Sequence, residues 1–444
     1  MQYPLLFNST IYFAFYSSIW HIRNTIATPL YHNQKEETLK HTVQRFSMIA
    51  LLLIMVQIST YAGGFQLNEH GARAMAQGGA WAARAYDGSA IFFNPAGLGF
   101  QKENSIYLGS TIIMPTGAYF DPLKNNKKTE MVAQTFTPIN VYGTYRINDD
   151  INVGLGINNP YGLGTEWPSN WDGRFISVKV DMKSFFFTPT VSYKINDQLS
   201  LGVGANIVTG SVTIDRSVAV PSFLPEPTVK LDLSAMGYGF NLGALYKITP
   251  EISIGASYRS AIDLDATGTA TFTNNSTILN LPEGDAAASL TLPSTAFFGL
   301  AVKPMENLEL EADYQYVGWS SYDKLTIEFK KDPSKNSTAD KKYENTYIIR
   351  VGGEYTMDAF QFRAGYLYDH SPVQPKYVDP MLPDAHRNGL NLGIGYKVTS
   401  NITVDLSYLN LAFDQAKAVG TDSGFDGTFT AGANLFGFNF GYTF

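Results

Sequence analysis

Residues 435–444, at the end of the chain, read LFGFNFGYTF and decide the fold. Successive side chains of a β-strand point to opposite faces. One face of this strand would therefore be entirely aromatic, with Phe436, Phe438, Phe440, Tyr442 and Phe444. Apolar residues toward lipid and small or polar residues toward a lumen are typical of an outer-membrane β-barrel. We expect the terminal Phe444 to be read by the barrel-assembly machinery.

The same alternation recurs along most of the chain after Glu103, for example over residues 236–246, 390–398 and 402–408. Several such segments in a row indicate strands. An aromatic residue, a cation and a short polar turn follow one another at one end of several segments, as in residues 193–198. Longer stretches rich in Pro, Asn, Ser and Lys follow the other ends, and we expect them to be loops: residues 115–130, 160–180, 216–230, 266–287, 330–343, 371–385 and 414–428. Short turns at one rim and long loops at the other match the asymmetry of outer-membrane barrels.

The predicted fold is all-β and transmembrane: a fourteen-stranded antiparallel up-and-down outer-membrane β-barrel, plugged by a small, partly helical N-terminal hatch. An even strand number suits such a barrel, and closure leaves no unpaired edge in lipid. We expect the strands at residues 103–114, 132–147, 151–159, 181–195, 199–215, 231–248, 251–265, 287–303, 306–318, 343–356, 359–370, 386–398, 401–413 and 431–444.

Composition excludes several classes of protein. Charged residues are 16% of the 444 residues and aromatic residues 14%, whereas soluble domains contain about 25% charged residues. The mean hydropathy of −0.09 is too low for a helical membrane protein. The net charge of −7, without a basic patch, argues against a nucleic-acid partner. The absence of cysteine removes disulfides and any thiolate metal ligand or nucleophile.

Signatures of catalysis are also missing from the sequence. The histidines after residue 62 are His70, His370 and His386, and they do not form a His-Glu-x-x-His motif. The chain has no Gly-x-Ser-x-Gly nucleophile elbow. Ser371 beside one of the last two histidines is the enzymatic alternative, since outer-membrane phospholipases carry a Ser–His pair. We expect no enzyme, no cofactor and no metal.

The N-terminal region predicts a secretory signal. Residues 48–56 (MIALLLIMV) form an apolar run that is too short for a membrane helix of about 20 residues. Basic residues precede the run and Thr60-Tyr61-Ala62 follows it, so we predict a signal peptide at residues 40–62, cleaved after Ala62. A buried strand is the alternative. Residues 1–39 would then be an upstream extension from a misassigned start.

Residues 63–102 do not alternate and are rich in Ala and Gly. So short a segment is too small to be stable alone. A plug packed inside the barrel would give it a core. We therefore expect a hatch at 63–102 and the barrel at 103–444.

At the hatch a family resemblance becomes specific. The motifs, in chain order, are Gly64-Phe65-Gln66-Leu67-Asn68-Glu69, Phe93-Asn94-Pro95-Ala96, Tyr161-Gly162-Leu163-Gly164-Thr165-Glu166, Trp319-Ser320, Ser371-Pro372-Val373, and Leu382-Pro383-Asp384 with Arg387. This ordered set resembles the FadL-type outer-membrane transporters of long-chain fatty acids and other hydrophobic compounds. The resemblance covers essentially the whole chain after residue 62.

The resemblance implies passive uptake. A fatty acid would be captured near the extracellular loops, the hatch would rearrange, and the ligand would leave sideways through a gap at a kink in the third strand. The kink is expected at Asn158, Asn159 and Pro160, because proline cannot donate to a ladder. The hatch residues Phe93, Asn94, Pro95 and Ala96 would form the gate and lie against the kink. A plain capping turn is the alternative for Asn94-Pro95.

The resemblance also implies cations for the ligand's carboxylate. Arg216 matches a basic residue after the fifth strand, with a solvated loop residue as the alternative. Glu344 stands where the family has a second cation, so the neighbouring Lys341 and Lys342 become candidates, although a surface position is favoured for both.

Other readings of the barrel stay open. Aromatic hydrocarbons could replace fatty acids as substrates in the same fold. A structural or adhesive barrel would not transport, and an aqueous porin would need a wide polar bore, which a plug argues against. The expected partners are lipophilic ligands, outer-membrane lipid and lipopolysaccharide, with a monomeric barrel in the outer membrane of a Gram-negative cell.

Overall fold

The computed structural model describes residues 63–276 and 278–444. The predicted signal peptide at 40–62 and the upstream residues 1–39 lie outside the described residues. In the part of the chain that is described, no helix combines the length and the apolarity needed to cross a bilayer.

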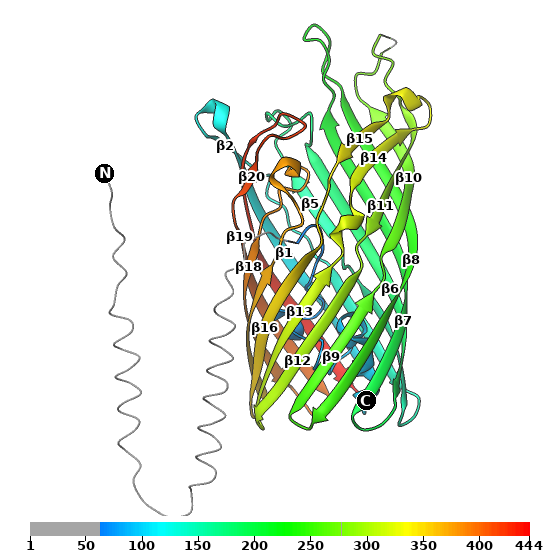
Figure 1. Ribbon diagram of the computed structural model, residues 1–444, viewed down its shortest axis with the longest axis vertical. Helices are drawn as coiled ribbons and strands as arrows, with labels where there is room; N and C mark the ends of the chain where they lie inside the picture. Colours follow the sequence, from blue (N-terminus) through cyan, green and yellow to red (C-terminus); the bar gives the residue numbers. More distant parts are fainter. Residues whose placement is uncertain (1–62, 277) are drawn as a thin grey trace, which may run out of the picture. The chain divides into compact units, whose positions relative to one another are not determined.

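Fourteen antiparallel strands close into a barrel, which confirms the predicted fold (Figure 1). The first and last strands make the closure. Here β1 (Ser105–Asp121) pairs with β21 (Gly427–Thr443), from Ser105 opposite Thr443 to Phe120 opposite Thr428. The wall between them consists of β3 (Ile139–Arg146), β4 (Ile151–Asn158), β6 (Lys179–Lys194), β7 (Leu199–Ser217), β8 (Thr228–Thr249), β9 (Ile252–Arg259), β12 (Thr295–Met305), β13 (Leu308–Val317), β16 (Thr346–Met357), β17 (Phe360–Asp369), β18 (Arg387–Lys397) and β19 (Ile402–Phe413).

The sheet continues above the wall at the long-loop end, which is the upper end in Figure 1. The additional strands are β2 (Lys127–Glu130), β5 (Gly162–Glu166), β10 (Ile262–Phe272), β11 (Gly284–Leu292), β14 (Lys324–Phe329), β15 (Ser337–Asp340) and β20 (Ala416–Ala418). The predicted loops at 266–287 and 330–343 are therefore partly wrong. Strands that rise above the lipid need no apolar outer face, so their alternating signal is weak.

The last strand has the two faces predicted for it. Phe436, Phe438 and Tyr442 are exposed on the outside, whereas Gly437 and Asn439 are buried. The aromatic face therefore points to lipid. The opposite face is small enough to let the hatch approach.

Residues 63–104 lie inside the barrel, and their helices lie in its lower half in Figure 1. They form the short helices α3 (Ala72–Met75), α4 (Ala90–Phe93) and η1 (Pro95–Phe100), whose residues are almost all buried. The hatch backbone reaches the wall at lumen-facing glycines: a methyl group at Gly352 or Gly365 would overlap the backbone of Gln77. Glycine at these positions permits that close approach.

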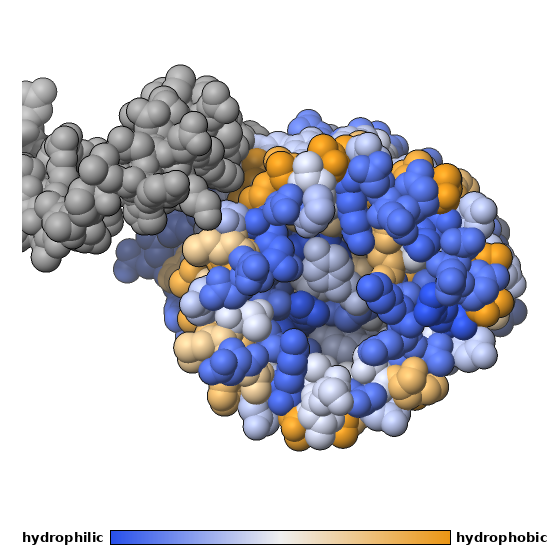
Figure 2. Space-filling view, turned by 90° about the horizontal axis from the view of Figure 1, so that it is seen from below, coloured by the Kyte–Doolittle hydropathy of each residue, from blue (hydrophilic) through white to orange (hydrophobic). Residues whose placement is uncertain are grey.

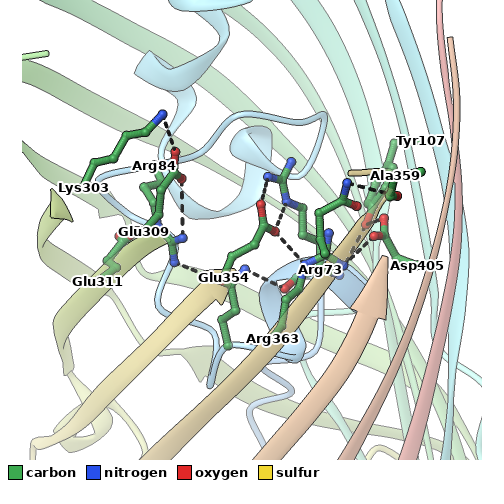
Figure 3. A network of polar contacts seen from close by, with 12 residues as sticks. Arg73, Arg84, Tyr107, Lys303, Glu309, Glu311, Glu354, Ala359, Arg363 and Asp405 are labelled. Atoms are coloured by element: carbon green, nitrogen blue, oxygen red, sulfur yellow. Dashed lines mark hydrogen bonds and ion pairs between the residues drawn. The ribbon is translucent and has the colours of Figure 1, made fainter. Parts of the chain in front are cut away.

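Buried ion pairs fix the hatch to the wall at the short-turn end (Figure 3). Arg73 of α3 donates two hydrogen bonds to Glu354 of β16, at 2.9 and 2.7 Å. Arg363 of β17 donates to the same carboxylate at 2.6 Å and to Asp405 of β19. Farther along the hatch, Arg84 donates to Glu311 of β13 at 2.7 Å. These contacts hold the body of the hatch on several strands at once.

Candidate ligand-binding site

The ladder between the second and third wall strands is interrupted. The pairing of β3 with β4 ends where Asn140 faces Asn158. After Pro160 the chain resumes as β5, which pairs with β6 alone, starting with Gly162 opposite Lys183. Proline has no N–H to donate, so the third strand separates from the second at this point.

Two hydrogen bonds frame the interruption. At its lower edge, the N–H of Ile139 donates to the side-chain oxygen of Asn159 at 2.8 Å. At its upper edge, the N–H of Val132 donates to the carbonyl of Glu166 at 2.8 Å. Within the described residues, no backbone hydrogen bond joins 133–138 to 160–165 between these edges. We call this frame the lateral window.

The leading segment of the hatch lies behind the window. Leu67 donates its N–H to the carbonyl of Pro160 at 2.8 Å, and Gly162 donates to the carbonyl of Phe65 at 3.0 Å. Gln66 and Tyr161 thus form an isolated antiparallel bridge. Residues 65–67 take the place beside the third strand that the second strand has left.

An aromatic cluster anchors this segment. The Phe65 ring is edge-on to Trp319, Tyr322 and Tyr161, with centroids 4.7, 5.6 and 6.0 Å away. The preceding Gly64 has φ +66°, and a side chain there would overlap Trp319. Glycine is favoured at such a position because it adopts positive φ without strain.

The first described residues are also held by a charged pair. The N–H of Gly64 donates to Asp384 at 2.8 Å. Arg387 donates to the carbonyl of Gly64 and, at 2.8 Å, to Asp384. The hydroxyl of Ser371 donates to the same carboxylate at 2.8 Å. The loop motifs at 371–373 and 382–387 therefore converge on the start of the hatch.

A cavity of about 410 Å³ connects this region to the window. Its volume lies in the range of small-molecule sites, about 300–1,000 Å³. Its lining is largely apolar and includes Phe65, Leu67, Ile113, Met131, Phe136, Leu163, Met182, Leu411, Phe413 and Leu435. The lining also includes Ile139 and Phe185, which are 37% and 39% exposed on the outer surface. The cavity thus extends from the hatch to the outside of the wall.

Phe136 narrows the window. It belongs to the stretch before β3, which still pairs with β1 through the bridge from Ile113 to Phe136. Its ring lies on Gly164 of β5, where any side chain would overlap it. The apolar Phe136 ring therefore occupies part of the lateral window.

The predicted carboxylate ligands lie away from the cavity. Arg216 is half-buried near the end of β7 and is not among the lining residues. Lys341 is buried against Asp379, and Lys342 is a surface residue that pairs with Asp323 at 2.9 Å. The cations that line the cavity are Lys183 and Arg387. In the sequence Arg387 stands out only as part of a motif, since its contact with Gly64 joins residues 323 positions apart.

The predicted gate residues also lie elsewhere than expected. The Asn94 side chain donates to the carbonyls of Ala82, at 2.7 Å, and Ala244, at 3.0 Å. Pro95 packs on Gly202 and Gly243. The Asn94-Pro95 turn therefore lies against β7 and β8. The expectation that it lies against the third-strand kink is wrong, because that place is taken by residues 65–67.

A histidine of the hatch contacts the kink. His70 Nε2 lies 2.9 Å from the carbonyl of Leu67, and its Nδ1 lies 3.4 Å from the side-chain nitrogen of Asn158. Burial, together with the positive charges of Arg259 and Arg350, lowers the pKa of His70 to about 3. Burial raises the pKa of the adjacent Glu69. A neutral imidazole is therefore part of the docked hatch.

The short-turn end is polar. A second cavity of about 500 Å³ is lined by charged residues that include Arg73, Asp87, Glu354, Arg363 and Asp405. Figure 2 shows this end, with hydrophilic side chains around a recessed centre. The apolar cavity and this polar chamber lie on different sides of the hatch.

Comparison with known proteins gives one matching family. The model of the outer membrane protein transport protein family (OMPP1/FadL/TodX) matches residues 53–444. The long-chain fatty acid transport protein of Escherichia coli O6:H1 is 24% identical, covering 90% of this chain and 98% of the relative.

Two solved structures show the same fold. A FadL homologue of Pseudomonas aeruginosa has a TM-score of 0.74 at 23% identity, covering 86% of this chain and 99% of its own. The Ralstonia pickettii toluene transporter TbuX has a TM-score of 0.64 at 20% identity, covering 84% and 98%.

Proposed function

The chain belongs to the OMPP1/FadL/TodX family of outer-membrane transporters of hydrophobic compounds, and from this premise we propose that it carries long-chain fatty acids into the cell. The ligand enters the apolar cavity, the leading hatch segment at residues 65–67 withdraws, and the ligand leaves sideways through the lateral window. The E. coli relative named for long-chain fatty acid transport supports this substrate class.

One observation carries the proposal: the apolar cavity has lining residues on both sides of the barrel wall. Leu67 lies on the hatch, whereas Ile139 and Phe185 are exposed on the outer surface. Each methylene group of the ligand that is removed from water stabilises the bound ligand by about 0.8 kcal/mol. A route that stays apolar from pocket to lipid keeps this stabilisation throughout. Passage straight through the barrel would instead expose the tail to the polar chamber around Glu354 and Arg363.

The carboxylate of the fatty acid needs a cationic partner while the acyl tail moves through the apolar cavity. We propose Arg387, because it lines the cavity and already binds both Gly64 and Asp384. A ligand carboxylate that competes for Arg387 would weaken the hold on Gly64, so that binding and hatch release would be coupled. Arg216, half-buried at the long-loop end, is proposed for an earlier encounter with the ligand.

A second candidate keeps the route and changes the cargo. TbuX has the same fold and is named a toluene transporter, and both lining cations here already have acidic partners: Lys183 pairs with Asp181 at 2.9 Å and Arg387 with Asp384 at 2.8 Å. A neutral aromatic hydrocarbon would leave those pairs intact.

The test is uptake by a Gram-negative host that lacks its own transporter and expresses this protein. We expect uptake of radiolabelled oleate, with weaker uptake of toluene. Uptake of toluene without oleate would favour the second candidate. Uptake of neither, with the folded barrel present in the outer membrane, would contradict transport of both cargoes. An Arg387→Gln variant is expected to lose oleate uptake and retain toluene uptake.

A further inference from the structure

Asn159 occupies the lower edge of the lateral window. It follows the last residue of β4 and precedes Pro160. Its side-chain oxygen accepts from the N–H of Ile139 at 2.8 Å, and its side-chain nitrogen donates to the carbonyl of Ser184 at 2.6 Å. One carboxamide thus spans from the second wall strand to the fourth, across the point where the third strand turns away.

This bridge meets a strict requirement of the membrane. An unpaired backbone group costs several kcal/mol in hydrocarbon, because lipid offers no partner. The break would leave the N–H of Ile139 and the carbonyl of Ser184 without the main chain of a neighbour. A primary amide supplies both an acceptor and a donor. Unlike a backbone hydrogen bond between two strands, these bonds can break by rotation of the Asn159 side chain, without movement of a strand.

We propose that Asn159 is a latch that sets how far the lateral window opens; this inference rests on the proposed sideways release of ligand. The residue lines the apolar cavity, and its partner Ile139 faces the outside. Asn159 therefore stands where the cavity meets the lipid. A ligand leaving at this level passes the carboxamide.

The latch is connected to the hatch through Ser184 and Tyr161. The hydroxyl of Ser184 donates to the carbonyl of Tyr161 at 2.7 Å and accepts from its N–H at 3.2 Å. Tyr161 in turn faces Gln66 of the hatch. When the hatch segment leaves Tyr161, the same Ser184 that holds Asn159 loses part of its support. Hatch withdrawal and window opening are thereby coupled through Ser184.

Two substitutions have opposite expected effects. Asn159→Ala removes both bonds and lowers the barrier to opening, so the initial rate of oleate uptake should rise about 25-fold, or about fivefold for each lost hydrogen bond. Asn159→Asp keeps the acceptor for Ile139 but cannot donate to Ser184. It also places a negative charge where the cavity meets the lipid, so the initial rate of oleate uptake should fall about tenfold.

The matched control is Asn206→Ala. Asn206 is also buried, and its amide oxygen accepts from Thr188 at 3.0 Å between β6 and β7, away from the window. Rates are measured in the transporter-deficient host, normalised to folded barrel in the outer membrane. Asn206→Ala should leave uptake unchanged. A purely structural Asn159 would lower uptake and thermal stability together in both of its variants, which would overturn the latch.

A measurement on the unaltered protein does not depend on variant folding. Hydrogen exchange at the Ile139 amide should accelerate when the purified barrel is saturated with oleate, while amides in β3 between Val141 and Arg146 stay protected. Unchanged protection of Ile139 in the presence of bound oleate would overturn the latch. If the wild-type protein transports neither oleate nor toluene, the proposed function fails instead.

Discussion

Gln66 and Tyr161 form an antiparallel bridge that replaces a missing part of the barrel wall. The two flanking hydrogen bonds, from Leu67 to Pro160 and from Gly162 to Phe65, are 2.8 and 3.0 Å long. The hatch therefore lies in the barrel lumen and also completes the wall. Its residues 65–67, which pair with the third strand at the lateral window, are called the provisional strand here. Withdrawal of the hatch would leave the carbonyl of Pro160 and the N–H of Gly162 without these partners.

The aromatic cluster around Phe65 should control how firmly that provisional strand is docked. Phe65 is 5% exposed and lies against Trp319. Replacing a buried Phe by Ala typically lowers stability by about 3–5 kcal/mol. We expect Phe65→Ala to accelerate hydrogen exchange of residues 64–69 while the barrel strands remain protected. The lipid-facing Phe438→Ala should leave these amides unaffected, and equal protection in both variants would argue against the anchor.

The body of the hatch should depend on its buried ion pairs. In the Glu354→Gln variant, Arg73 and Arg363 lose their shared carboxylate, whose side chain is 6% exposed. Removing one partner of a buried ion pair typically lowers the free energy of unfolding by about 3–5 kcal/mol. The exposed pair of Glu328 and Lys330, at 2.7 Å, is the control, and Glu328→Gln should cost about 0–1 kcal/mol. Urea unfolding of the purified barrel measures both. Similar values for the two variants would contradict a structural role of the network.

Much of the barrel was predictable because lipid imposes a period of two on every wall strand. The strand over residues 435–444 shows this, since its aromatic face meets lipid and its small face meets the hatch. The strands above the membrane were not predictable in the same way. Around Gly284, where β11 begins, the outer face meets water and the alternation no longer carries information.

The site was predictable only in part, because its contacts join distant segments. The kink residues 158–160 stand out through the proline, and the structure interrupts the strand there. Arg73 and Glu354 lie 281 positions apart, so no local pattern reveals their pairing. Only its position in the family pattern points to Arg216 as a ligand. Its distance from the cavity depends on loop packing at the long-loop end, for which the sequence holds no periodic signal.

Hatch docking should weaken in acid because of His70. Its pKa is about 3 in the docked hatch and about 6.5 when the segment is free. Between these values the released hatch binds a proton that the docked hatch excludes, so docking loses stability as pH falls from 7 toward 4. Glu69, whose pKa is raised by burial, acts in the opposite direction.

The comparison of wild type with His70→Gln isolates the histidine. We expect hydrogen exchange of residues 64–69, corrected for the intrinsic effect of pH, to increase between pH 7 and pH 4.5 in the wild type. The increase should be smaller in the variant. An identical pH response in both proteins would exclude His70 as its source.

The most direct test of sideways release is a disulfide that locks the hatch to the kink. Gln66 and Tyr161 are a non-hydrogen-bonded antiparallel pair, whose Cα atoms typically lie about 4.5 Å apart, within disulfide range. The chain contains no cysteine, so Gln66→Cys with Tyr161→Cys creates a single possible bond. Oleate uptake should stop when the bond is formed and return on reduction, while each single variant should transport under both conditions. Undiminished uptake with the disulfide fully formed would contradict release of ligand through the lateral window.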